Sequence, residues 1–372
     1  MIKRDLQKIL ESNINSGKII ILVGARQVGK TTLIQDILKN KKNVLFLNGD
    51  DPAVRRILAN INTEELKNLL NGYSFAFIDE AQRIENIGIT LKIIADQIKN
   101  IQIFASGSSA FEINNLMQES LTGRKWEYLL LPISWKEFEE NQGYLKSQQQ
   151  LNLRIVYGMY PEVINNFGNE YEILKQLAES YLYKDILNFS GIRKPEILEN
   201  LLKALAYQVG GEVSYNELSK LLSVDVKTVS NYIDLCVQNY IIFKLPSFSR
   251  NLRNEIKNNQ KIYFWDNGIR NIIIGNLNHI ETREDVGKLW ENFLISERLK
   301  KINNELLLTK SFFWRTRQQQ EIDYIEDFNG KIFGYEIKWG SNSKLKIPKT
   351  FTNSYNSDIR LINQNNFRDF VI

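Results

Sequence analysis

The sequence is poor in the side chains that most often bind transition metals or act as catalytic nucleophiles. Its 372 residues include one cysteine, Cys236, and one histidine, His279. A single cysteine excludes an internal disulfide and favours a reducing compartment. A zinc site or a histidine-based triad is effectively excluded. Any bound metal is therefore expected to be held by carboxylates and hydroxyls, which favours Mg²⁺ or Mn²⁺.

Long apolar runs are also missing. No run approaches the roughly 18 residues that a membrane-spanning helix needs. The amino terminus opens into a polar helix over residues 3–16 without a signal-peptide core. We therefore expect a soluble, cytoplasmic protein of two or three domains with no membrane partner. The formal net charge of +5 permits nucleic-acid binding without requiring it.

What the sequence does contain is a phosphate-binding loop. An apolar strand, Ile19–Val23, leads into a GxxxxGKT segment and then into a helical pattern, Leu33–Leu38. This order of strand, glycine loop and helix is that of a P-loop, in which backbone N–H groups and the helix dipole face a polyphosphate. We expect Lys30 to reach the β- and γ-phosphates of ATP and Thr31 to bind Mg²⁺. The residues expected to bind the nucleotide are Gly24, Ala25, Arg26, Gln27, Val28, Gly29, Lys30, Thr31 and Thr32.

Acidic and polar residues follow the next two apolar strands, which we place at 73–78 and 101–105. Asp79 and Glu80 follow the first of them, and Ser106 and Ser108 follow the second. The carboxyl ends of parallel strands form the ligand-binding edge of an α/β sheet. We therefore expect Asp79 to hold Mg²⁺ and Glu80 to activate the attacking water as a general base. Ser108 is a candidate contact for the γ-phosphate, although serines are also common in loops that bind nothing.

An arginine lies outside these predicted core strands, in the pair Gly123-Arg124. An arginine presented to a neighbouring subunit's γ-phosphate would stabilise the charge of the transition state. Arg124 is therefore a candidate catalytic residue within a homo-oligomer. A surface salt bridge is the structural alternative.

The middle of the chain reads as helical and then as a winged helix. Helices are predicted at 197–209, 215–222 and 226–239, with strands of the wing at 240–243 and 261–264. The last helix offers Lys227, Thr228, Ser230 and Asn231 where a DNA reader places its base contacts. Eight lysines and arginines oppose seven acids between residues 195 and 261, so the electrostatic footprint is weak. We favour packing or switching and leave DNA contact open. The basic side chains on the wing side are Arg250, Arg253, Lys257 and Lys261.

From about residue 280 the pattern indicates a helix followed by β-hairpins. With a two-residue loop Asp323 faces Glu336, and with a four-residue loop it faces Gly334. In either case Asp323, Glu336 and Lys338 share one face. We expect Gly334 to leave space on that face and Glu291, on the helix 286–299, to complete a second metal site. By spacing alone, an exposed ion-pair face is the alternative. The side chains expected on the opposite, apolar face are Ile322, Tyr324, Phe333, Tyr335 and Ile337.

Together these motifs resemble the AAA-type ATP-binding proteins of bacteria and archaea that carry a C-terminal domain of unknown function with a PD-(D/E)XK nuclease-like core. The resemblance implies an ATPase core and a nuclease-like fold at the C-terminus. In related signalling ATPases a glycine-x-proline segment contacts the adenine side of the nucleotide; here Gly158-Met159 stands where the family often has two glycines. The motifs are Gly24–Thr32, Phe77–Gln82, Ser106–Ser108, Gly123-Arg124 with Leu131-Pro132, Tyr160–Glu162, Tyr181–Ile186 and Glu321–Asp323.

We therefore predict an α/β protein with a P-loop ATPase core (1–150), a helical lid or linker (151–194), a winged helix (195–265) and a nuclease-like α/β domain (266–372). The predicted function is Mg²⁺-dependent ATP hydrolysis that controls the later domains, with an output on DNA in repair, mobile-element control or defence. The alternative is an ATP-dependent switch that binds a protein partner while the nuclease-like domain is inactive. A kinase using the same loop is less favoured, because no lid or acceptor-substrate signature is present.

Overall fold

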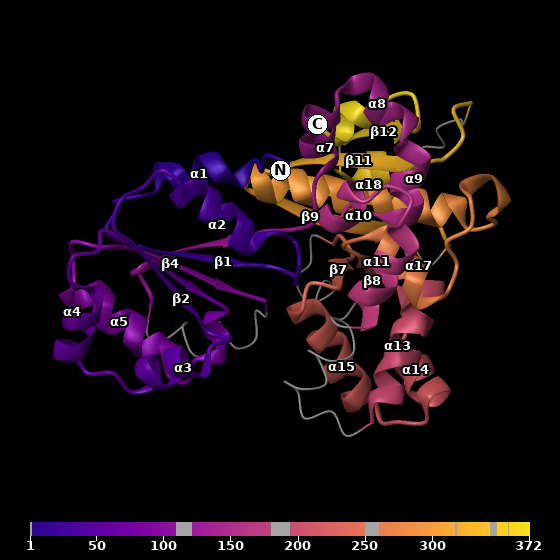
Figure 1. Cartoon of the computed structure of the whole chain (residues 1–372). Coiled ribbons are helices and arrows are strands. Elements are labelled where there is room, and N and C mark those ends of the chain that lie inside the picture. Colours follow the sequence, from indigo (N-terminus) through magenta and orange to yellow (C-terminus); the bar gives the residue numbers. More distant parts are fainter. Residues whose placement is uncertain are drawn as a thin grey trace. The chain divides into compact units, whose positions relative to one another are not determined.

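The computed structural model describes residues 2–108, 121–179, 194–249, 260–316, 318–342, 348–355 and 357–372 (Figure 1). They form two compact units: residues 1–132 with 238–240, and residues 133–237 with 241–372. The domain boundary near residue 150 stays a prediction. The further division of residues 151–372 into three domains stays a prediction.

The first unit is built on a parallel sheet of five strands in the order β2-β3-β4-β1-β5. The central strand β1 is buried along its whole length, which explains its uninterrupted apolar sequence. Parallel pairing brings the carboxyl ends of all five strands to one edge of the sheet. The strands are β1 (Ile19–Val23), β2 (Val44–Asn48), β3 (Phe75–Asp79), β4 (Gln102–Gly107) and β5 (Lys125–Leu129).

Helices cover both faces of this sheet (Figure 1). Leu58, Leu66 and Leu91, from three helices on one face, share a buried cluster with residues of β1, β3 and β4. This doubly wound arrangement is the one predicted for a P-loop ATPase core, so the α/β fold class with a parallel sheet is confirmed. The helices on that face are α3 (Pro52–Ala59), α4 (Thr63–Leu70) and α5 (Ile87–Gln97); α1 (Leu6–Ser12) and α2 (Lys30–Leu38) lie on the other.

The edge strand β5 was not predicted. It pairs with β1 from Ile19 opposite Lys125 to Val23 opposite Leu129, and the Leu130 N–H donates to the Val23 carbonyl. Most of its side chains are at least partly exposed, because one of its edges and part of its surface face solvent. Such a strand lacks the apolar run that marks the buried strands in the sequence.

The second unit begins with short helices and continues with a three-helix segment. Three strands pair there in the order β6-β8-β7 and are antiparallel. The predicted helices agree within two residues, while β7 begins and ends later than predicted; the winged-helix interpretation stays a prediction. The elements are α7 (Trp135–Gln142), α8 (Tyr144–Gln149), α9 (Leu151–Tyr157), α10 (Pro161–Asn165), α11 (Glu170–Leu177), α13 (Pro195–Tyr207), β6 (Glu212–Val213), α14 (Tyr215–Leu222), α15 (Val226–Gln238), β7 (Ile242–Pro246) and β8 (Gln260–Phe264).

The unit ends in a four-stranded sheet of order β12-β11-β10-β9. Strands β9, β10 and β11 are antiparallel, but β12 is parallel to β11. The expectation of hairpins alone is therefore wrong for the last strand, because a parallel pair needs a crossover, here through α19. The elements are α17 (Asn267–Ile273), α18 (Val286–Asn304), β9 (Thr309–Arg315), β10 (Glu321–Phe328), β11 (Lys331–Ile337), α19 (Lys349–Tyr355), β12 (Asp358–Ile362) and α20 (Phe367–Val371), with short 3₁₀ turns at Ala81–Arg83 and Ile280–Thr282.

The hairpin register between β10 and β11 is one of the two predicted, the one with the two-residue loop. Tyr324 lies opposite Tyr335, and a two-residue turn with positive φ at Asn329 and Gly330 closes the hairpin. One face assignment is wrong, because the pairing of β9 with β10 shifts register between Ile322 and Ile325. Ile322 therefore packs in one cluster with Ile325 and not on the opposite face.

The space expected at Gly334 is filled by packing. A Cβ built there would lie 3.2 Å from Cγ1 of Ile359 and 3.4 Å from Cγ2 of Ile322. Glycine at this position lets the two isoleucine side chains approach the backbone. Within the described parts of the chain, no helix has the length and apolarity needed to cross a bilayer.

Candidate functional site

The phosphate-binding loop connects β1 to α2 and depends on its two glycines for different reasons. Gly29 precedes α2 with a φ of 97°, a left-handed conformation that favours glycine. Gly24 lies against the end of β5, where a Cβ would come within 2.1 Å of the Leu130 carbonyl oxygen. The shape of the loop is thus set by local handedness at one end and by close packing at the other.

Two buried basic side chains donate hydrogen bonds to backbone carbonyls in and beside this loop. The buried Lys30 ammonium donates to the carbonyl oxygens of Gly24 (2.9 Å) and Ala25 (2.8 Å). The Arg4 guanidinium, also buried, donates to the carbonyl oxygens of Val28 (2.9 Å) and Leu131 (2.6 Å). The role of Arg4 was not foreseen, because a lone arginine far from the motif carries no sequence signal.

Asp79 lies at the end of β3 and is bonded through both carboxylate oxygens. The Thr31 hydroxyl donates to its Oδ2 at 2.8 Å, and the Ser106 hydroxyl donates to its Oδ1. Strand β4 lies between β3 and β1, so Ser106 is well placed to bridge toward the loop. The structure therefore brings together the predicted Thr31 and Asp79, and their oxygen atoms form a donor set that suits Mg²⁺.

Glu80, the predicted general base, follows in a left-handed conformation with a φ of 48°. Its carbonyl lies so close to Gly49 that a Cβ on that glycine would come within 2.4 Å of the oxygen. The Glu80 N–H donates to the Ser106 hydroxyl at 3.4 Å. Because a non-glycine residue in this conformation is strained, the surrounding contacts must hold it there.

Gln82 connects Glu80 to Ser108, and sequence reasoning missed this role. Its Nε2 donates to Glu80 Oε2 at 2.6 Å and to the Ser108 hydroxyl at 3.0 Å. The side chain is 6% exposed, and its Oε1 is buried without a hydrogen-bond partner. The predicted base and the predicted γ-phosphate contact are therefore joined by one buried amide. The sequence signal that could have revealed it is the position of Gln82, two residues after Glu80 in the motif Phe77–Gln82.

Arg124 lies at the opposite edge of the sheet from the loop. It immediately precedes Lys125, which pairs with Ile19 at the start of β1, and five strand residues span roughly 16 Å. Its Nε forms a salt bridge with Asp96 Oδ1 at 2.6 Å. Arg124 is therefore far from this chain's own loop, and a role toward a neighbouring subunit stays a prediction.

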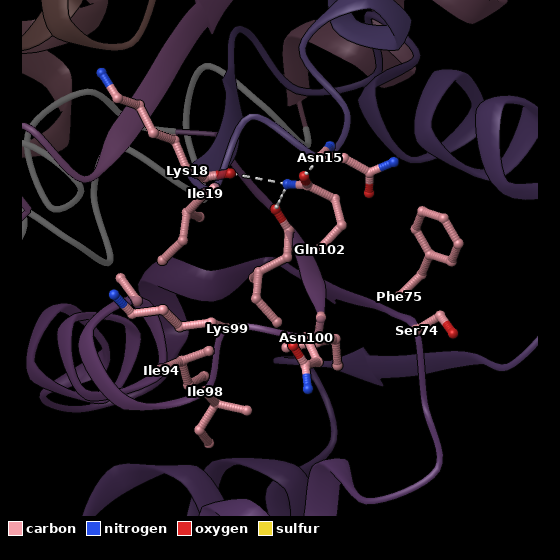
Figure 2. A pocket seen from close by; sticks show the side chains of 14 residues that line it. Asn15, Lys18, Ile19, Ser74, Phe75, Ile94, Ile98, Lys99, Asn100 and Gln102 are labelled. Carbon is pink, nitrogen blue, oxygen red and sulfur yellow. Dashed lines mark hydrogen bonds between the residues drawn. The ribbon is translucent and has the colours of Figure 1, made fainter.

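A cavity of 380 Å³ opens at this same amino-terminal edge (Figure 2). Gln102 accepts from the Asn15 N–H at 2.9 Å and donates to the Lys18 carbonyl at 2.9 Å, as Figure 2 shows. The lining of the cavity includes the start of β1 and of β4, whereas the phosphate loop follows the carboxyl end of β1. This cavity is therefore separate from the nucleotide site.

The segment Gly158–Pro161, which was considered for a contact with adenine, packs against Asp266 within the second unit. The Met159 N–H donates to Asp266 Oδ2 at 2.6 Å, and a Cβ on Gly158 would lie 2.0 Å from Asp266 Oδ1. Met159 and Tyr160 are fully buried. The role of this segment toward the nucleotide, like that of Pro161, stays a prediction, and the motif Tyr181–Ile186 lies outside the described residues.

The predicted C-terminal carboxylates form a dense ionic cluster within the second unit. Lys338 Nζ lies 2.7 Å from Glu336 Oε1 and 3.7 Å from Asp323 Oδ2. Asp323 Oδ2 also accepts the Ile337 N–H at 2.8 Å. The structure thus brings these three side chains to one face as predicted, and Glu291 is linked to them by a residue that was assigned elsewhere.

That residue is Lys261, which the sequence analysis grouped with the basic side chains on the wing side. It is 2% exposed, and its Nζ lies 3.4 Å from Glu291 Oε1 and also pairs with Glu321. The Tyr263 hydroxyl donates to the same Glu291 oxygen at 2.6 Å. Strand β8 therefore buries Lys261 among carboxylates, a contact that the sequence analysis did not predict.

The cluster shifts the titration of its members. Burial raises the pKa of Glu291 to about 7, against the opposing charge of Lys261 and with a further contribution from Asp323. Burial alone would lower the pKa of Lys261, but Glu291, Glu321 and Asp323 raise it above its ordinary value. Within the residues that the structure describes, no three acidic, histidine or cysteine side chains are arranged to hold a metal ion. The second metal site predicted from Glu291, Asp323 and Glu336 stays a prediction.

Three family models match the chain in sequence. Residues 16–139 match an AAA domain, and residues 148–279 and 286–368 match two domains of unknown function (DUF8612 and DUF4143). The sequence of the first unit is therefore similar to that of an AAA-type ATPase domain. The expectation of a C-terminal domain of unknown function is confirmed, while its nuclease-like character stays a prediction.

Proteins of similar sequence align with most of this chain. The uncharacterized protein Rv2008c of Mycobacterium tuberculosis is 25% identical over 351 residues, covering 92% of this chain and 75% of that protein. MJ1544 of Methanocaldococcus jannaschii is 25% identical over 353 residues, covering 87% and 75%. Among solved structures, the Walker-type ATPase paby2304 of Pyrococcus abyssi aligns with a TM-score of 0.48 and 16% identity, covering 73% of this chain and 96% of that chain.

The contact between Gln82 and Glu80 predicts a kinetic effect. Gln82→Met keeps the length of the side chain but removes the N–H donor, so Glu80 loses its orientation. We expect kcat for ATP to fall roughly ten- to hundredfold, with ATP affinity unchanged in a binding titration. Gln97→Met, at an exposed position on α5, is the matched control. A folded Gln82→Met protein with normal kcat would contradict the assignment.

The raised pKa of Glu291 predicts a pH-dependent stability. Its ordinary pKa is 4.5, and in the folded protein it is about 7, so the folded state binds the extra proton between these values. The contribution of Glu291 to stability is full below about pH 4.5 and is lost as the pH rises to 7. We expect Glu291→Gln, measured by urea unfolding, to gain roughly 1–3 kcal/mol relative to wild type between pH 5 and 8. An equal pH dependence of the two proteins would contradict the shift.

Proposed function

We propose that this protein is a Mg²⁺-dependent ATPase whose nucleotide state controls the middle and C-terminal parts of the chain. The observation that carries the proposal is the bonding of Asp79 to Thr31 beside a Glu80 that Gln82 orients. Thr31 and Asp79 would hold the metal ion. Bound there, Mg²⁺ would supply positive charge that offsets the negative charge of the phosphates during transfer.

The remaining steps belong to side chains of this chain. Lys30 gives up its bonds to the Gly24 and Ala25 carbonyls and donates to the phosphates, while the amides of the loop surround them. Glu80 accepts a proton from the attacking water. Ser108, already bonded to Gln82, contacts the γ-phosphate and so links its presence to the position of Glu80.

This mechanism predicts separate effects of two substitutions. Glu80→Gln keeps the size of the side chain but removes the base, so we expect ATP binding to persist while turnover falls roughly 10²- to 10⁴-fold. Lys30→Ala removes the phosphate contact, so we expect ATP binding itself to be lost. Calorimetry and phosphate release measure the two quantities. Glu85→Gln, at an exposed position, is the control, and unchanged turnover in Glu80→Gln would refute Glu80 as the base.

We further propose that the output is on DNA, through the start of α15. The Thr228 N–H and hydroxyl both donate to Asp225, at 2.8 Å and 2.6 Å, so Asp225 caps the start of α15 and the Thr228 hydroxyl is engaged in that cap. Ser230 lines a cavity of 440 Å³ together with residues of α14, β7 and β8. Lys227, Ser230 and Asn231 remain the candidates for contact with DNA.

The DNA proposal predicts a salt-dependent contribution from Lys227. A lysine that pairs with a phosphate releases one counterion, so Lys227→Ala should weaken binding to all DNA sequences and lower the slope of log K against log salt by about 1. Fluorescence anisotropy at several salt concentrations measures this slope. Lys220→Ala, on α14, is the control of equal charge. An unchanged slope for Lys227→Ala would contradict the assignment.

The second candidate function is a switch that binds a protein partner while its C-terminal carboxylates stay idle. The pairing of Lys261 with Glu291 and Glu321 favours it, because the cluster is already charge-compensated by the chain itself. Incubation of plasmid DNA with Mg²⁺ and ATP separates the two. Nicking that Asp323→Ala abolishes and Asp358→Ala preserves supports a nuclease. Intact DNA beside ordinary ATP turnover supports the switch.

A further inference from the structure

The ionic cluster of the second unit joins elements that are distant in sequence. Its carboxylates come from α18 (Glu291), β10 (Glu321 and Asp323) and β11 (Glu336), and β8 contributes Lys261 and Tyr263. Lysine is almost never fully buried unless it is paired. Here Lys261 is buried with its ammonium against Glu291 and Glu321.

One oxygen atom of Glu291 and one of Asp323 are already engaged by groups of the chain itself. Glu291 Oε1 receives the Tyr263 hydroxyl and lies 3.4 Å from Lys261 Nζ. Asp323 Oδ2 accepts the Ile337 N–H and lies 3.7 Å from Lys338 Nζ. A divalent cation at this place would compete with two ammonium groups for the same acceptors and would be repelled by both.

The backbone also closes over Glu291. Gly210 has a φ of 73°, and a Cβ built on it would lie 3.1 Å from Glu291 Oε1. The Gly210 N–H donates to the Ile262 carbonyl of β8 at 3.3 Å. The turn before β6 therefore lies directly over this carboxylate, and β8 fixes that turn.

We propose that the Lys261 ammonium is the resident cation of this cluster and holds the place that a divalent metal ion would take in a nuclease-like site. Strand β8 holds Lys261 in this position. Loss of the Lys261 charge would therefore allow a divalent cation to bind among Glu291, Asp323 and Glu336. Cleavage of DNA at such a site would rest on the predicted nuclease-like character of the C-terminal part. The binding of a cation does not depend on it.

Titration of the full-length protein with Mn²⁺, without nucleotide, tests this inference. We expect wild type and Asp323→Asn to give the same isotherm, because the cluster takes up no divalent ion while Lys261 is present. Lys261→Met should gain one Mn²⁺ site per chain, and the double variant with Asp323→Asn should lose it. Lys261→Arg, which keeps the cation, should gain none.

Lys338→Met is the matched control, since it removes the same charge from the half-exposed lysine of the cluster. It should gain no site, because Lys261 still engages Glu291. Wild-type binding that depends on Asp323 would overturn the proposal, as would a folded Lys261→Met protein that gains no site. If Lys261→Met does not fold, the wild-type and Asp323→Asn isotherms decide: identity supports the proposal and a difference overturns it. ATP turnover plays no part in this test, so the two proposals fail separately.

Discussion

The pair of hydrogen bonds to the Asp79 carboxylate is the interaction on which the nucleotide site depends. A buried carboxylate is costly unless its oxygens are bonded, and here Thr31 and Ser106 each satisfy one of them. These three residues follow or end three adjacent parallel strands, so their meeting is a direct result of strand order. The same edge carries Glu80 and Gln82. The parallel sheet therefore assembles the whole site from short, separate sequence segments.

The buried carboxylates of the second unit are stabilised in a different way from Asp79. Its carboxylates are compensated by lysine side chains and a tyrosine hydroxyl from the chain itself, and the cost of burial appears in the raised pKa of Glu291. Around Asp79, by contrast, neutral hydroxyl groups are the donors, which leaves the negative charge available to a cation. The two carboxylate centres thus differ in whether the protein has already neutralised them.

The parts of the structure that the sequence predicted are those with local causes. The glycine loop, the buried strands, the acidic strand end and the hairpin turn at Asn329-Gly330 each follow from a few consecutive residues. The missed features have non-local causes. The edge strand β5 lacks an apolar run, the register shift at Ile322 arises from pairing with β9, and the burial of Lys261 depends on where β8 meets α18 and β10. Arg4 and Gln82 were missed because their partners are set by the fold.

The position of β5 has a consequence for dividing the protein into fragments. Strand β1 is apolar and buried throughout, with β4 on one edge and β5 on the other. A fragment that stopped after β4 would leave the second edge of β1 as a row of unpaired amides and carbonyls flanked by apolar side chains, which is a template for aggregation. A fragment that keeps both edges of β1 paired therefore has to include β5, Lys125–Leu129.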